Sequence, residues 1–297
     1  MRKRIIKTGI LLIVLMLVAY VGIRLAVFVT SPFEEINTGN EIEKVEVKED
    51  GNLVINALVM GLDKDETRTD TLIFVSYNSN TGKCFVMSIP RDTYVYINGR
   101  ATLINAAYGI GGAELTINKV KELTGLPINY YVVFTFKDFR NVIDALGGVE
   151  FDVRPEGYYY DDPYQDLHIN IPGGRQLLDG KTAEGLVRFR ADYARADLER
   201  VEIQQRFISE LIKQKFNVKS ITSLPKVYNT LKTSLKSNLG LNDILAYSDD
   251  VLSAGIKEIE TVTLPTRDYG AHLLPDEAGI KALMEQYFAS EEEALAE

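Results

Sequence analysis

The chain of 297 residues contains one cysteine and two histidines. Cys84 has no partner for an intrachain disulfide, and its apolar neighbours favour a small buried side chain. His168 and His272 stand alone, without other Cys or His residues at metal-ligand spacing. This excludes a zinc site and argues against a histidine-activated nucleophile. Chemistry in this protein must therefore use carboxylates, arginines or a bound cation.

Positive charge is also scarce, because 33 Lys and Arg residues oppose 42 Asp and Glu residues. The formal net charge is −9 and the pI is near 5.0. Nucleic-acid-binding domains usually carry a basic face and a high pI, so we expect no nucleic-acid partner. The hydrophobic content of 46% is ordinary for a globular protein and predicts a packed core. Any polyanion would have to be bound by a local cluster of cations.

Such a cluster lies between residues 188 and 206, where the sequence has five arginines and no lysine: Arg188, Arg190, Arg195, Arg200 and Arg206. Guanidinium groups are planar, two-pronged donors that fit phosphate oxygens. Arg188 and Arg190 alternate as in a strand, just before a helix predicted over 196–216, and a helix start beside arginines is a good anion site. In that helix Asp197, Arg200 and Gln204 share one face, and a solvated helix with ion pairs explains the same pattern. Both interpretations remain open from these residues alone.

The N-terminus predicts a membrane anchor. Residues 5–29 are apolar and long enough to span a bilayer, with Lys7 and Arg24 near the ends. Basic residues precede this run and acidic residues follow it, which places the N-terminus in the cytoplasm and the rest of the chain outside the cell membrane. A cleaved signal peptide is the alternative. The expected organisation is a basic N-terminus and single-pass anchor over 1–29, an acidic linker over 30–52, one extracellular domain over 53–289 and an acidic tail over 290–297.

The order of apolar segments predicts an α/β fold. Strands are expected at six β-branched-rich segments: 53–60, 71–77, 83–89, 130–136, 149–153 and 260–264. Residues 78–82, between the second and third of these, have the composition of a hairpin turn. Helices are expected over 113–124, 138–146 and 196–216. Several strands are continuously apolar and so buried on both faces. We therefore expect a mixed central β-sheet sandwiched between helices (α/β/α).

Two polar segments follow predicted strands. Asp63 and Asp70 flank a loop after the first strand, and Arg91 and Asp92 follow the third. Strand ends form the usual ligand edge of an α/β sheet, and spaced carboxylates there can hold a hard divalent cation. An aspartate-rich loop and a surface Arg–Asp pair are the structural alternatives.

Together the motifs resemble the LytR-CpsA-Psr (LCP) family, from about Leu53 to the C-terminal region. The resemblance is carried by Gly61-Leu-Asp63, Arg68-Thr-Asp70-Thr71, Ser88-Ile-Pro-Arg91-Asp92-Thr, Ile104-Asn105-Ala-Ala-Tyr108 with Gly111-Gly112, Asn129-Tyr130-Tyr131, Asp144-Ala-Leu-Gly147-Gly148-Val149, Leu178-Asp179-Gly180, Arg188-Phe-Arg190 and Asp197 with Arg200 and Gln204. It implies a membrane-anchored, outward-facing transferase. Such an enzyme moves a glycopolymer from a polyprenyl-diphosphate carrier onto peptidoglycan.

The resemblance also implies roles for individual residues. It implies Mg²⁺, or Mn²⁺, at Asp63 and Asp70, and binding of the substrate diphosphate by Arg68, Arg91, Arg188, Arg190, Arg200 and Gln204. It implies catalytic roles for Asp63, Asp70, Arg91 and Arg190, and supporting roles for Asp92 and Asp197. The loop between Asp63 and Asp70 is shorter than in many relatives, and Ile203 stands where an arginine often precedes the matching glutamine.

The expected reaction is attack by a peptidoglycan hydroxyl on the sugar-side phosphorus of the lipid diphosphate. The sequence leaves open which aspartate is the base and whether the polymer is teichoic acid, capsular polysaccharide or another secondary wall polymer. Aromatic residues over 130–139 and the helix over 196–216 are candidates for the walls of a lipid slot, although an aromatic strand usually belongs to the core. A phosphohydrolase acting on the same lipid and a non-catalytic envelope-binding or regulatory protein are the alternative functions.

Overall fold

The computed structural model describes residues 53–163, 167–189, 196–215, 235–240, 243, 247 and 254–289, with only the backbone described for 196–199. The predicted anchor over 1–29, the linker over 30–52 and the tail over 290–297 lie outside the described residues. Arg190, Arg195 and the side chain of Asp197 lie outside them too. Among the described helices, none is both long enough and apolar enough to cross a membrane.

A six-stranded mixed sheet forms the centre of the fold. Its order is β11 (Lys236–Ser237), β6 (Tyr130–Phe134), β1 (Val54–Leu62), β2 (Thr69–Asn78), β3 (Lys83–Ser88) and β12 (Glu258–Thr263). The hairpins β1–β2 and β2–β3 are antiparallel, whereas β6 joins β1 and β12 joins β3 in parallel. The predicted turn between β2 and β3 is confirmed, and Gly82 supplies its left-handed residue with φ +68°.

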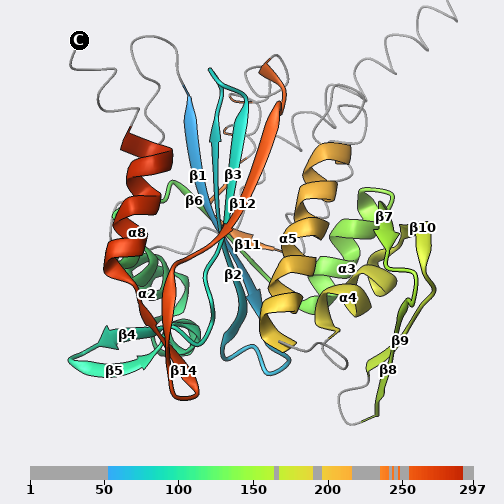
Figure 1. The fold of residues 1–297 in the computed structure, drawn as a ribbon, viewed down its shortest axis with the longest axis horizontal. Coiled ribbons are helices and arrows are strands. Elements are labelled where there is room, and N and C mark those ends of the chain that lie inside the picture. The colour runs from blue at the N-terminus through green and yellow to red at the C-terminus, as the bar shows by residue number, and fades with distance from the viewer. Residues whose placement is uncertain are drawn as a thin grey trace, which may run out of the picture.

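Helices cover both faces of this sheet (Figure 1). On one face lie α2 (Ala107–Thr124) and α8 (Glu277–Met284), and on the other lie α5 (Ala196–Lys215), α3 (Phe136–Ala145) and α4 (Gly180–Arg188). Side chains such as Leu58, Phe74 and Val120 are fully buried under the first layer. Cys84 is buried under the second, and burial raises the pKa of its thiol to about 11. The predicted central mixed sheet with helices is confirmed.

Short antiparallel hairpins extend from this centre. They are β4 (Tyr94–Ile97) with β5 (Arg100–Leu103), β8 (Tyr158–Asp162) with β9 (Leu167–Ile171), and β13 (Thr266–Tyr269) with β14 (His272–Pro275). The predicted strand over 149–153 is β7 (Val149–Val153), but it pairs with β10 (Gly174–Leu178) outside the central sheet. Short helical turns, η1 (Ile104–Ala106) and η3 (Glu285–Ala289), adjoin α2 and α8.

The strand-like interpretation of Arg188 is wrong, because Arg188 lies in the last turn of α4. Asp179 caps the start of this helix, where its Oδ1 accepts the Thr182 N–H at 2.8 Å. Ala183 and Leu186 then bury one helical face against the cluster around β7 and β9. Phe189, directly after the helix, is extended, with φ −62° and ψ 136°.

Replacing Asp179 by alanine should destabilise the protein by about 1 kcal/mol near pH 7, as loss of an N-cap does. Hydrogen bonds from the Thr182 side chain and backbone lower the pKa of Asp179 in the folded state. A lowered folded pKa stabilises the protein above the ordinary carboxyl pKa of about 3.9, and this contribution disappears as pH falls through the folded value. Urea unfolding of wild type and variant should therefore differ near pH 7 and converge in acid. An equal difference at both pH values would contradict the capping role.

Candidate active site

The loop between β1 and β2 is organised by Asp63. Its Oδ1 accepts the backbone N–H groups of Thr67 at 2.9 Å and Arg68 at 3.1 Å, and its own N–H donates to the Arg68 carbonyl at 2.9 Å. These side-chain bonds use Oδ1, which leaves Oδ2 available to a ligand. The start of α2 lies against this loop, because a Cβ on Gly109 would come within 2.4 Å of the Thr67 carbonyl oxygen.

Asp70 and Arg91 form an ion pair beside this loop. Asp70 lies near the start of β2, and Arg91 follows β3, its neighbour in the sheet. The Arg91 Nη1 lies 2.5 Å from Asp70 Oδ1, and its Nε lies 3.6 Å from Asp92 Oδ2. The polar segments after β1 and after β3, both expected at the ligand edge of the sheet, are therefore in direct contact.

Arg188 is held in place by two contacts, with Glu184 and with the Phe136 ring. Its Nη1 donates to Glu184 Oε1 at 2.6 Å, and the other oxygen of Glu184 pairs with Arg140. The Arg188 guanidinium also lies over the Phe136 ring, 4.3 Å from the centroid. Glu184 is only 5% exposed, so a buried carboxylate joins the two arginines and fixes the orientation of Arg188.

One face of α5 carries Arg200 and Gln204, one turn apart. Arg200 is 4% exposed, and the Gln204 Nε2 donates to the Val187 carbonyl at 3.0 Å. Gln205 on the neighbouring face fixes the helix over the sheet, since its Nε2 donates to the Val262 carbonyl at 2.7 Å and to Ser88 Oγ at 3.1 Å. The helix position, and with it the direction of Arg200, is thus set by the strand ends.

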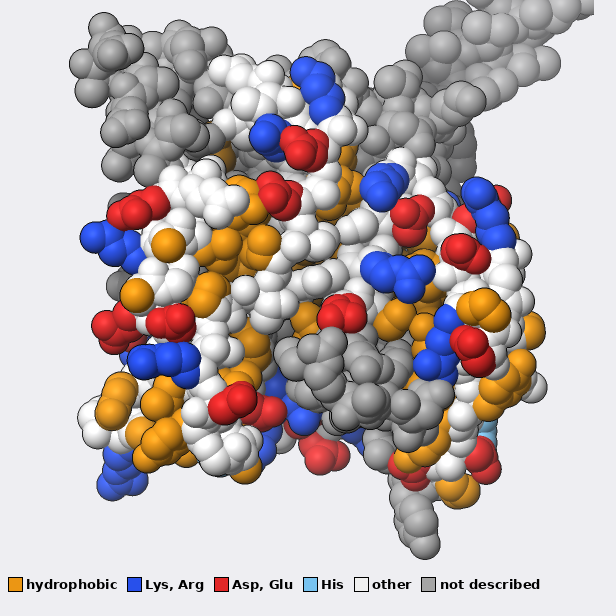
Figure 2. Space-filling view, in the orientation of Figure 1, with side chains coloured by type: hydrophobic (Ala, Val, Ile, Leu, Met, Phe, Trp, Pro, Cys, Tyr) orange, Lys and Arg blue, Asp and Glu red, His pale blue; other side chains and the backbone are white. Residues whose placement is uncertain are grey.

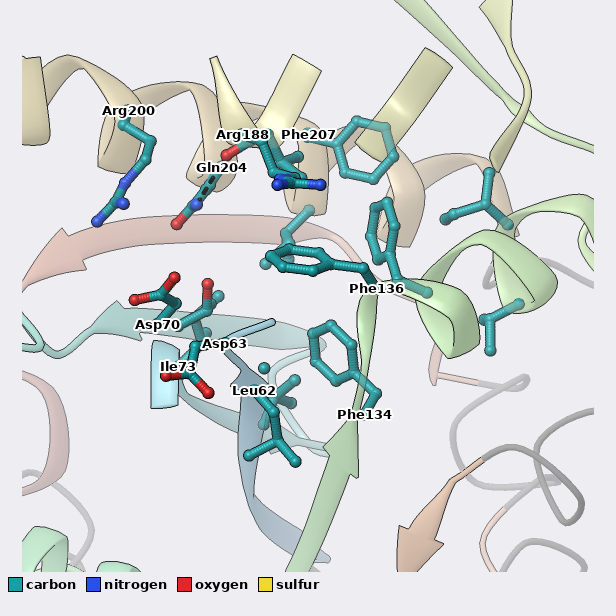
Figure 3. A pocket seen from close by; sticks show the side chains of 18 of the residues that line it. Leu62, Asp63, Asp70, Ile73, Phe134, Phe136, Arg188, Arg200, Gln204 and Phe207 are labelled. Carbon is teal, nitrogen blue, oxygen red and sulfur yellow. Dashed lines mark hydrogen bonds between the residues drawn. The ribbon is translucent and has the colours of Figure 1, made fainter. Parts of the chain in front are cut away.

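Several of these side chains line the polar end of a cavity of about 700 Å³ between the sheet and the α3–α5 layer. Figure 3 shows Asp63 and Asp70 on the sheet side, facing Arg188, Arg200 and Gln204 on the helical side. The arrangement sets carboxylates against guanidinium groups across a space that a ligand can enter.

The rest of the cavity is apolar. It is lined by Ile73 of β2 and by aromatic rings from three elements: Phe134, Phe136, Phe139 and Phe207. The predicted strand over 130–136 ends early because Thr135 forms a capping box with Asp138, which starts α3 at Phe136. Rings from both sides of this junction therefore face the cavity, within the aromatic segment that the sequence analysis singled out.

The structure does not bring every predicted site residue into the cavity. Arg91 and Asp92 do not line the cavity, although Arg91 pairs with Asp70, which does. Arg68 is exposed on the loop and does not line the cavity either. Arg190 and the Asp197 side chain lie outside the described residues. Sequence reasoning missed Glu184, although it lies four residues before Arg188, the spacing of an ion pair on a helix.

Within the described residues, no group of three or more His, Cys, Asp or Glu side chains is arranged to hold a metal ion. Asp63 and Asp70 line the same cavity as two carboxylates. Mg²⁺ is commonly held by one or two carboxylates together with substrate phosphates and water, so this donor set fits Mg²⁺ when a phosphate ligand supplies the remaining oxygens.

Comparison with protein families gives a match to the LytR_cpsA_psr family over residues 26–294. The chain belongs to this family. A relative in Bacillus subtilis strain 168, named polyisoprenyl-teichoic acid–peptidoglycan teichoic acid transferase TagU, is 30% identical over 240 residues, which cover 79% of this chain and 76% of the relative. The regulatory protein MsrR of Staphylococcus aureus strain COL is 32% identical over 228 residues, or 75% of this chain and 67% of MsrR.

A solved LytR-CpsA-Psr structure gives the same fold. The crystal structure of TagV from B. subtilis superposes with a TM-score of 0.66 at 25% identity, covering 78% of this chain and 95% of TagV. The mixed sheet and its helical layers are thus those of the family, and the cavity lies between sheet and helices of that shared fold.

Proposed function

We propose that this LytR-CpsA-Psr protein transfers a glycopolymer from a polyprenyl-diphosphate carrier to a hydroxyl of peptidoglycan. One observation carries the proposal: a single cavity joins an apolar interior to an end where carboxylates face guanidinium groups. A lipid diphosphate likewise has an apolar part, its hydrocarbon chain, and a charged part, its diphosphate head. The name of TagU, a teichoic acid transferase acting on peptidoglycan, supports the same reaction class.

In this proposal the diphosphate lies between the Asp63–Asp70 side and the side of Arg188 and Arg200. Planar guanidinium groups fit its oxygens and stabilise charge that develops on the leaving phosphate. Asp63 and Asp70 would hold Mg²⁺, or Mn²⁺, which when bound neutralises negative charge on the diphosphate oxygens. Arg91 orients Asp70 through their ion pair, and Gln204 is held toward the same space by its bond to Val187.

The transfer step needs little covalent help from the protein. The acceptor hydroxyl oxygen forms a bond to the sugar-side phosphorus, and the bond from that phosphorus to the bridging oxygen breaks. The hydroxyl proton passes to a carboxylate at the polar end, Asp63 or Asp70, and polyprenyl phosphate leaves with the bridging oxygen. The protein's contribution is orientation and charge stabilisation in a site partly shielded from water.

The apolar part of the cavity would receive the first isoprene units of the carrier. The rings of Phe134, Phe136 and Phe207 provide a surface without hydrogen-bonding groups, which suits a hydrocarbon. We further propose that residues 5–29 anchor the chain in the cell membrane with the catalytic domain outside, where both lipid carrier and peptidoglycan are accessible.

Teichoic acid, capsular polysaccharide and other wall polymers would all present the same diphosphate to these groups. The full chain in detergent, incubated with a polyprenyl-diphosphate-linked teichoic acid precursor, peptidoglycan and Mg²⁺, should form a covalent conjugate that a chelator prevents. Release of free polymer phosphate without conjugate would identify a phosphohydrolase. Binding without any product, across several donors, would identify a non-catalytic binding or regulatory protein.

A further inference from the structure

Two hairpins beside the site expose tyrosine rings on a common surface. We propose that this tyrosine face, formed by Tyr94, Tyr96 and Tyr269, binds the glycan strand of peptidoglycan that accepts the polymer. The inference rests on the proposed transfer function and adds the position of the acceptor.

The first part of the face comes from β4. Val95 and Ile97 are buried in the main core, so the alternation of the strand turns Tyr94 and Tyr96 to the opposite, outer side. Tyr96 is 69% exposed. Its cross-strand partner on β5 is Ala101, whose small side chain leaves the tyrosine ring uncovered.

The second part comes from the β13–β14 hairpin. Tyr269 and His272 face each other across the two strands, and both contact Tyr94 edge to face, with ring centroids at 6.0 Å and 5.2 Å. Tyr269 nevertheless remains 59% exposed. The contacts with Tyr94 therefore fix the ring positions while leaving ring surface open to a ligand.

The hairpins are tied to each other and to the candidate active site. Thr93 and Leu273 form a parallel bridge, and the Leu273 N–H donates to the Asp92 carbonyl at 3.1 Å. Asp92 adjoins Arg91, which pairs with Asp70. A ligand on the tyrosine face would thus be held at a fixed position relative to the polar end of the cavity.

The position of the face matches the geometry of the reaction. The apolar cavity lies on the α5 side of the sheet, whereas β4, β5 and β14 extend below α2 and α8 on the other side (Figure 1). In phosphoryl transfer the attacking and leaving oxygens lie roughly in line with phosphorus. If the lipid leaves toward the α5 side, the acceptor hydroxyl must approach from the side of the hairpins.

The chemistry of the face favours a glycan. Figure 2 shows hydrophobic side chains gathered at the lower left, over β4, β5 and β14. A tyrosine ring offers a flat apolar surface to the C–H face of a sugar and a hydroxyl for its polar groups. The charged residues of the two hairpins are Arg100, Arg267 and Asp268, so the described part has no concentration of cations that would select an anionic membrane or polymer.

Binding is tested by co-sedimentation of the full chain in detergent with purified peptidoglycan sacculi stripped of attached polymers. The double variant Tyr96→Ala/Tyr269→Ala should bind about tenfold more weakly, from the loss of two stacking surfaces. The double variant with phenylalanine at both positions should keep most of the affinity. Tyr159→Ala is the matched control, because Tyr159 is 57% exposed on another hairpin and should bind as wild type does.

The assay contains no lipid donor, so its outcome does not depend on whether transfer occurs. Wild-type affinity in the alanine double variant, or equal weakening in Tyr159→Ala, would overturn the proposal. So would a double variant that keeps sacculus binding but loses binding of the lipid-linked donor, since the face would then hold the donor polymer. With transfer established, the double variant should raise the acceptor KM about tenfold and leave kcat within a few-fold.

Discussion

Replacing Arg188 by methionine should lower the transfer rate by about 10²- to 10³-fold, the usual effect of removing one charge-stabilising donor from an active site. Arg188 lines the polar end of the cavity and is held by Glu184 and Phe136, so its guanidinium is already positioned before substrate binds. Methionine keeps much of the side-chain volume over Phe136 and removes the charge. The rate is measured as conjugate formed per unit time at saturating donor and acceptor.

Two further variants make the result specific. Arg188→Lys should be intermediate, because an ammonium group supplies charge without the planar fork. Arg175→Met removes an exposed arginine that pairs with Glu150 outside the cavity, and its rate should match wild type. Arg188→Met with a wild-type rate and a wild-type fold would show that this guanidinium takes no part in the reaction.

Replacing Glu184 by alanine should destabilise the protein by about 3 kcal/mol. The substitution leaves Arg188, with a side chain only 14% exposed, without the carboxylate that now neutralises it, and an unpaired buried charge is costly. Arg140 is 39% exposed and reaches water more easily, so the expected effect lies at the lower end for such pairs. Urea unfolding near pH 7 measures the change.

Glu150→Ala provides the control for Glu184. Glu150 is also paired with an arginine, but both partners are exposed, so its loss should change stability by less than about 1 kcal/mol. Glu184→Gln should lie between wild type and Glu184→Ala, because the amide oxygen still accepts a hydrogen bond. Equal effects at Glu184 and Glu150 would show that burial of the Glu184 network contributes nothing to stability.

The central sheet could be predicted because its strands are continuous apolar runs interrupted by turn residues. The same reasoning placed the segments that contain Asp70 and Arg91 at the ligand edge of the sheet, where the two side chains form an ion pair. At these positions the order and spacing of residues along the chain were enough to predict their place in the fold. No such local rule identified β7 as a partner of β10, because pairing depends on which distant strand presents a complementary edge.

The environment of Arg188 shows where sequence reasoning fails. Gly180 and Gly185 are poor helix formers, and the short Arg-Phe-Arg alternation resembles a strand, so helix α4 was missed. Packing of Ala183 and Leu186 overrides that weak local preference. The contact of Glu184 with Arg140 joins α4 to α3, and the tyrosine face joins β4 to the β13–β14 hairpin; neither has a signal in local periodicity.

The central claim is transfer at the sugar-side phosphorus of a lipid diphosphate, and the identity of the lipid product tests it most directly. Full chain, lipid-linked donor, peptidoglycan and Mg²⁺ should yield polyprenyl phosphate and a conjugate joined through a phosphodiester, both identified by mass spectrometry. Release of polyprenyl diphosphate with a conjugate that lacks phosphorus at the new linkage would contradict the account, because the bond broken would then be the sugar–oxygen bond.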